Sequence, residues 1–106
     1  MNAAATFQTK AADRYLAKLC DHFGTRVKAK HRANKGWVQF AIGRCEMMAD
    51  ETALTLLVLA DDQTQLDLLT TIVGAHLDRF AFRENPELNW QPLDETSGTD
   101  AQISPT

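Results

Sequence analysis

Three short segments between residues 25 and 49 alternate in the direction of their side chains between a more apolar and a more polar set, a fourth at 52–60 is apolar on both sides, and only gaps of turn length separate the four. Alternation with a period of two is typical of β-strands that bury one face, and short gaps join neighbouring strands antiparallel. Parallel strands would need crossovers of about a dozen residues, for which this stretch has no room. The stretch therefore predicts a four-stranded antiparallel meander, with strands at residues 25–31, 37–42, 44–49 and 52–60.

Two helical patterns flank the predicted meander. Residues 10–23 place Tyr15, Leu19 and Phe23 on one side of a helix that ends before Gly24. A second helix is expected from Asp61-Asp62, whose carboxylates can cap free backbone N–H groups, to about Phe82. This order predicts an α+β fold, a two-layer sandwich with both helices on one face of the sheet. Leu88-Asn89-Trp90 is a candidate for a short final strand.

Length and composition indicate one domain. The chain has 106 residues, of which 44% are hydrophobic and 24% charged, and this fits a single hydrophobic core. We expect a flexible N-terminus at residues 1–9, one α+β domain at 10–92 and a disordered, polar tail at 93–106. The sequence shows neither a membrane-spanning apolar run nor the pattern of a signal peptide, so the expected location is cytoplasmic and the expected partners exclude membranes.

The charge is distributed unevenly. A formal net charge of −3 argues against general binding of nucleic acid. However, five of the 11 lysines and arginines fall between Arg26 and Lys35. The alternation places most of them on a solvated face of the sheet, where they could attract phosphate or carboxylate groups.

Three side chains form a candidate metal centre. His22 lies at the edge of the first helix, Cys45 at an inward strand position, and His76 on the inner side of the second helix. Imidazole and thiolate are ligands for zinc, iron or copper, so a transition metal is a candidate cofactor. The competing interpretation makes these residues part of the core, because a buried histidine can bond a carbonyl and a free cysteine packs as a small hydrophobe.

Three arginines form a candidate anion site. Arg79 and Arg83 are four residues apart near the end of the second helix, and Arg44 could join them as a clamp. The ordinary alternative is that Arg79 and Arg83 interact with the helix dipole. Together with His22, Cys45 and His76, these arginines are the candidate ligand-binding residues.

Large apolar residues are predicted on the outer face of the sheet. Trp37, Leu57 and Leu59 point away from the side that the helices cover. Either the segment at residues 88–90 covers them, or a second copy of the chain does. A homodimer through these three residues is therefore a candidate assembly.

Three separated blocks of the sequence carry a resemblance. They are Tyr15-Leu16 with Leu19-Cys20 and His22-Phe23, then Gly43-Arg44-Cys45, then His76-Leu77 with residues 79–84, followed by Trp90. The pattern resembles a bacterial family of domains of unknown function. The resemblance implies small stand-alone proteins and domains fused to siderophore-interacting flavoproteins. Some members are named as a dihydroxyheptenedioate aldolase, whereas the lysines of this chain fall on predicted wet faces that do not suit Schiff-base chemistry.

Three functions follow from these features. The first is a bacterial binding or accessory module without catalysis, which recognises an anionic or metal-chelating small molecule and is linked to siderophore or iron metabolism. The second is a small metal-dependent enzyme that uses His22, Cys45 and His76. The third is a homodimeric interaction module in which the histidines are structural.

Overall fold

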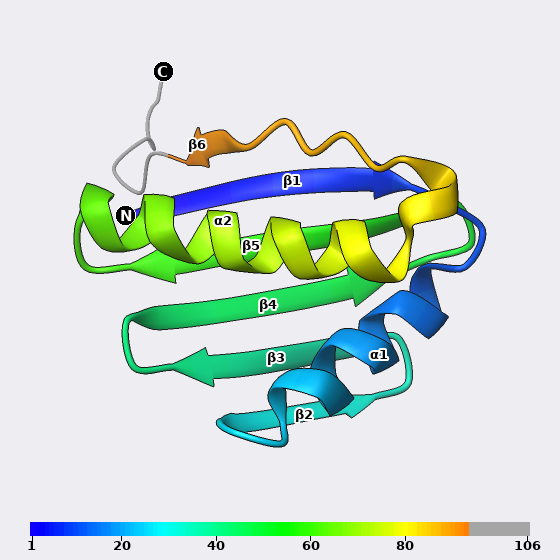
Figure 1. Ribbon diagram of the computed structural model, residues 1–106, viewed down its shortest axis with the longest axis horizontal. Coiled ribbons are helices and arrows are strands. Elements are labelled where there is room, and N and C mark those ends of the chain that lie inside the picture. The colour runs from blue at the N-terminus through cyan, green and yellow to red at the C-terminus, as the bar shows by residue number, and fades with distance from the viewer. Residues whose placement is uncertain (94–106) are drawn as a thin grey trace.

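The computed structural model describes residues 1–93 and contains one six-stranded antiparallel sheet with two α-helices (Figure 1). In chain order the elements are β1 (Asn2–Gln8), α1 (Ala12–Phe23), β2 (Lys28–Arg32), β3 (Lys35–Phe40), β4 (Gly43–Ala49), β5 (Ala53–Ala60), α2 (Gln63–Phe80), the short 3-10 helix η1 (Phe82–Glu84) and β6 (Gln91–Leu93). The predicted α+β class, the meander of β2 to β5 and the two helices are confirmed.

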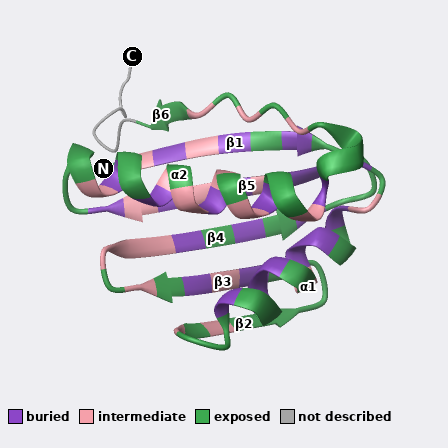
Figure 2. Cartoon of the chain, in the orientation of Figure 1, coloured by how far each residue is buried: buried purple, intermediate pink, exposed green. Residues whose placement is uncertain are grey.

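Both helices lie on one face of the sheet and enclose the core (Figure 1). Figure 2 shows the buried residues concentrated along the strands and on stretches of both helices. Inward positions alternate along each strand, because successive side chains point to opposite faces. Within the described residues no helix is long and apolar enough to cross a membrane. The largest fully buried side chains are Leu16, Leu19, Val38, Cys45, Leu54, Leu56, Val58, Leu69, Val73 and Leu77.

The N-terminal segment corrects the predicted strand count. Residues 1–9 are predicted to be flexible, but β1 pairs with β5 along its whole length, from Asn2 opposite Leu59 to Gln8 opposite Ala53. Its inward side chains Ala3, Ala5 and Phe7 are all buried. The strand order is β2-β3-β4-β5-β1-β6, so β1 is an interior strand of the sheet and not a free terminus.

The C-terminal segment also differs from the prediction. The last strand is β6, which pairs with β1, whereas residues 88–90 precede it and form no strand. Leu88 and Trp90 pack beside Gly74 of α2, on the helix side of the sheet. They therefore do not cover Trp37, Leu57 and Leu59. Leu93, the first residue of the predicted disordered tail, belongs to β6, and residues 94–106 lie outside the described residues.

Local chemistry explains several boundaries. The Asp62 carboxylate accepts a hydrogen bond from the backbone N–H of Gln65 at 2.8 Å, which confirms the predicted cap of α2. Gly36 falls between the strands predicted at residues 25–31 and 37–42, but it lies inside β3. A Cβ at this position would lie 2.8 Å from the Cys20 Sγ and 3.0 Å from a Leu16 methyl, so α1 can approach β3 only over a glycine.

Candidate functional site

The outer face of the sheet, on the side away from both helices, is not covered by any described element (Figure 1). Cross-strand pairing arranges its side chains in rows, in which neighbours are close enough to act together. One row runs Lys30, Trp37, Glu46 and Leu57, and the next runs Arg32, Lys35, Met48 and Thr55.

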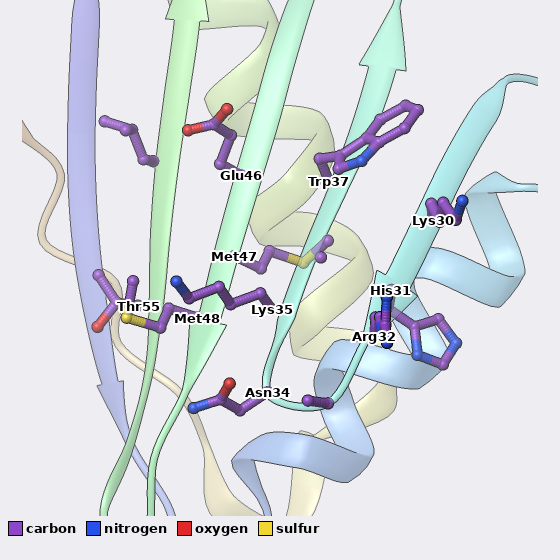
Figure 3. A pocket seen from close by; sticks show the side chains of 13 residues that line it. Lys30, His31, Arg32, Asn34, Lys35, Trp37, Glu46, Met47, Met48 and Thr55 are labelled. Carbon is purple, nitrogen blue, oxygen red and sulfur yellow. The ribbon is translucent and has the colours of Figure 1, made fainter.

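A hollow of about 730 Å³ opens over these two rows and the β2–β3 turn (Figure 3). Its apolar surface comes from Trp37, Met48 and Leu57. Met48 is 51% exposed, which is unusual for a side chain of this kind in the middle of a sheet. Lys30, Arg32 and Lys35 stand along the same hollow. This volume falls within the range of about 300–1,000 Å³ that is typical of small-molecule sites.

We call this feature the basic hollow, because cations dominate the part of the face that surrounds it. On β2, β3 and β4 the outward side chains include five cations and one carboxylate, although the whole chain has a net charge of −3. Strands β5, β1 and β6 present no ionisable side chain on this face. The positive charge is therefore concentrated on one half of the sheet, and an anion is drawn to that half. The cations are Lys28, Lys30, Arg32, Lys35 and Arg44.

Arg44 and Glu46 hold Trp37 in place at the hollow. The Arg44 guanidinium carbon lies 4.6 Å from the Trp37 ring centroid, within the range of a cation–π contact. The Arg44 Nε donates to the Glu46 carboxylate at 3.0 Å. Glu46 is the only carboxylate among the residues that line the hollow, and it is already paired with Arg44. It therefore does not neutralise the lysines along the hollow.

The turn at the rim of the hollow contains a strained residue. Ala33 has a φ of 55°, a left-handed conformation that residues with a side chain rarely adopt. Such a conformation costs of order 1–3 kcal/mol and is found disproportionately at binding sites. Ala33 itself lines the hollow, so the strained residue lies at its rim.

The predicted metal centre is only partly assembled. The rings of His22 and His76 lie 4.8 Å apart, centroid to centroid, between α1 and α2. Burial raises the pKa of the Cys45 thiol to about 12, with further contributions from Cys20 and Glu46, so this thiol stays protonated. Within residues 1–93 no three His, Cys, Asp or Glu side chains are grouped so that they could hold a metal ion. His76 also faces α1, not the sheet, and its ring lies 4.8 Å from that of Phe23.

The three predicted anion-binding arginines lie on different parts of the molecule. Arg79 is exposed in the last turn of α2, and Arg83 is exposed in η1 beside the Phe82 ring. Arg44 points to the outer face, because its neighbour Cys45 points to the core. The structure does not bring all three arginines together, and Arg44 lies beside the basic hollow, over the Trp37 ring.

A second polar cluster, which we call the Glu84 latch, was not predicted. The Thr9 hydroxyl donates to one Glu84 carboxylate oxygen at 2.7 Å, and the Tyr15 hydroxyl donates to the other. These two bonds tie the end of α2 and η1 to the β1–α1 loop and to α1. They lower the pKa of Glu84, with the Tyr15 bond as the larger cause, and the same bond raises the pKa of Tyr15. The only sequence signal was that Tyr15 and Glu84 both belong to the recognised blocks.

Comparison with known proteins identifies the chain. A family model described as "Uncharacterized protein conserved in bacteria (DUF2218)" matches residues 4–91. The chain belongs to the DUF2218 family. This confirms the predicted membership of a bacterial family of unknown function. The matched range includes every residue named above for the basic hollow and the Glu84 latch.

One solved structure shares the DUF2218 fold of this chain. It is the NMR structure of PA4090 from Pseudomonas aeruginosa, with a TM-score of 0.74 and 27% sequence identity. The match covers 86% of this chain and 95% of PA4090. No curated protein matches the sequence. The fold is thus shared with a known structure, while the function has to be inferred from the site.

The Glu84 latch should stabilise the DUF2218 domain at neutral pH and lose its effect in acid. Because the folded pKa of Glu84 is lowered, its contribution is present above the unfolded pKa of about 4.3 and is lost as the pH falls through the folded pKa. We expect Glu84→Gln to lower the free energy of unfolding by about 0.5–1 kcal/mol at pH 7, a modest loss because Glu84 is solvent-exposed. Urea unfolding measured between pH 3 and 7 checks this, with exposed Glu87→Gln as the control. An equal acid response in wild type and Glu84→Gln would contradict it.

Proposed function

We propose that this DUF2218 domain is a binding module without catalysis, and that its basic hollow takes an anionic small molecule with a flat apolar part. The observation that carries the proposal is the combination of an apolar surface, made by Trp37, Met48 and Leu57, with lysines and an arginine along it. Apolar surface contributes affinity through burial, and the cations select the charge of the ligand.

Aromatic carboxylates and catecholates fit this description best. Each combines a planar ring, which can stack on an indole, with anionic oxygens, which lysine and arginine bind. Ferric catecholate complexes are anionic members of this class, so a link to siderophores is part of the proposal. The resemblance to domains fused to siderophore-interacting flavoproteins supports this choice of ligand by association.

The chemistry of the hollow favours binding over catalysis. Its lining offers one carboxylate, Glu46, which is paired with Arg44. His31 contributes to the rim, but its ring points toward α1, where Nε2 lies 3.2 Å from the Asp21 carboxylate. A general acid–base mechanism needs a side chain within hydrogen-bond reach of the bound ligand. The side chains that face this hollow instead provide charge and apolar contact.

The proposal predicts a charge-dependent affinity. We expect isothermal titration calorimetry to detect binding of 2,3-dihydroxybenzoate and its ferric complex, and to show much weaker binding of the neutral 2,3-dihydroxybenzamide. The Lys30→Gln/Arg32→Gln double variant should bind the acid at least about tenfold more weakly, equivalent to about 1.4 kcal/mol. Added salt should also weaken binding, because it screens exposed charges.

A matched variant controls for net charge. Lys10→Gln/Lys18→Gln removes the same two charges from exposed positions before and within α1, so its affinity should equal that of the wild type. Equal weakening in both double variants would contradict a site at the hollow. Tighter binding of a single-stranded oligonucleotide than of any small anion would contradict the ligand class.

A homodimer through Trp37, Leu57 and Leu59 is the second candidate. The specific observation in its favour is the uncharged half of the outer face, where Leu57 and Leu59 are half-buried and Leu93 is 44% exposed. Against it, a two-fold contact centred on the hollow would bring like charges together. Light scattering coupled to size-exclusion chromatography distinguishes the homodimer from a monomeric binding module. A molar mass of one chain at high protein concentration would contradict the homodimer.

A further inference from the structure

Two histidines meet on the helix side of the sheet, away from the basic hollow. His22 is exposed on α1, and His76 is half-buried on α2. Their ring centroids are 4.8 Å apart and their planes are inclined by 43°. Phe23 and Phe80 flank them, with Phe80 5.5 Å from the His22 ring. The pair therefore lies at an apolar lip that is open to solvent on the His22 side.

A hydrogen bond fixes which nitrogen of His76 is free. The Nδ1 of His76 lies 2.8 Å from the backbone carbonyl oxygen of Ile72, one turn earlier in α2. A carbonyl oxygen only accepts, so Nδ1 carries the hydrogen. In the neutral ring the lone pair is then on Nε2. Metal-ligating histidines commonly donate their other ring N–H to a backbone carbonyl in this way, which orients the ring and fixes the tautomer.

We propose that His22 and His76 form a two-imidazole site for a divalent transition metal ion such as Zn²⁺. Zinc–nitrogen bonds are about 2.0–2.1 Å long, so two imidazoles on one tetrahedral ion have ring centres about 5 Å apart. The observed separation is 4.8 Å. The separation of the ring centres therefore matches the spacing that two imidazoles on one ion require.

The remaining coordination positions belong to water or to another molecule. Within the described part of the chain no third His, Cys, Asp or Glu completes a group around this pair. The Cys45 thiol is buried in the sheet and does not group with the two histidines as a third ligand. The site therefore differs from the three-ligand centre predicted from the sequence, and it is accessible, whereas that centre would have been enclosed. It also functions independently of the basic hollow.

Calorimetric titration of the untagged full chain with Zn²⁺ tests the site. The expected result is one ion per chain, with affinity at least tenfold lower in His22→Gln and in His76→Gln. His22 is exposed, so His22→Gln should keep the fold even if His76→Gln does not. Nitrogen-15 NMR of the imidazoles gives a second readout, because Zn²⁺ should shift the Nε2 signal of His76 and leave Nδ1 protonated.

Two matched variants make the result decisive. His31→Gln removes the remaining histidine, which pairs with Asp21 at 3.2 Å, and Cys45→Ala removes the thiol of the three-ligand alternative. Both variants should bind Zn²⁺ as the wild type does. The proposal is overturned if the wild type binds no Zn²⁺, if His22→Gln leaves the affinity unchanged, or if binding is lost in His31→Gln or in Cys45→Ala.

Discussion

Phe7→Ala should lower the free energy of unfolding by about 3–5 kcal/mol, the usual cost of truncating a buried phenylalanine. The Phe7 side chain is 5% exposed, and its ring centroid lies 6.0 Å from that of Tyr15. Its strand partner Leu54 is fully buried. In a domain of this size each kcal/mol corresponds to about 4–8 °C in melting temperature. Calorimetry and urea unfolding should therefore show one of the most destabilised single variants of the chain.

The neighbouring Gln8 provides the control. Gln8 belongs to the same strand, but its side chain points outward and is exposed, so Gln8→Ala should change the stability by less than about 0.5 kcal/mol. If the N-terminal segment were flexible, Phe7→Ala and Gln8→Ala would both change the free energy of unfolding by small and equal amounts. That outcome would contradict the position of β1 inside the sheet.

Trp37→Ala should weaken binding of 2,3-dihydroxybenzoate by at least about 30-fold, which corresponds to about 2 kcal/mol. Trp37 is the largest apolar side chain that lines the basic hollow, and the Arg44 guanidinium carbon lies 4.6 Å from its ring centroid. A tryptophan of this kind at the centre of a charged site is the usual position of a binding hot spot. The fold should persist, because Trp37 lies on the open face and is only half-buried.

The second tryptophan provides both a probe and a control. Trp90 packs beside Gly74 on the helix side, so Trp90→Phe should bind normally and leave Trp37 as the only tryptophan. Ligand should then quench the fluorescence of Trp90→Phe but not that of Trp37→Phe. Quenching in Trp37→Phe would place the ligand near α2 and contradict the site.

The meander and the helices were predictable because their signals are local. Alternation defines β3 and β4, a short apolar run bounded by turn residues defines β5, and a capping aspartate marks the start of α2. Strand β1 was missed for two reasons. Its sequence contains a run of alanines, which have low preference for strands, and its partner β5 lies about 50 residues later in the chain. Long-range pairing with β5 and burial of Ala3, Ala5 and Phe7 against the core make this segment a strand.

The candidate site was predicted in parts. The helical periodicity predicted that His22 and His76 lie close together, and their ring centroids are 4.8 Å apart. The strand alternation predicted that Cys45 points inward and Trp37 outward, as the structure shows. The structure does not bring the three arginines of the predicted clamp together, because adjacent strand residues point to opposite faces and Arg44 lies on the face away from α2. The basic hollow was not predictable as a cavity. It depends on the β2–β3 turn and on the absence of any described element over this face.

The most direct test of the basic hollow is an NMR titration of the full chain with 2,3-dihydroxybenzoate, followed through the backbone amides and the two indole N–H signals. We expect the shifts to concentrate in β2, β3 and β4, with the Trp37 indole among the largest and the Trp90 indole unchanged. Shifts centred on α1 and α2, or none at millimolar ligand, would contradict the assignment of this face as an anion-binding site.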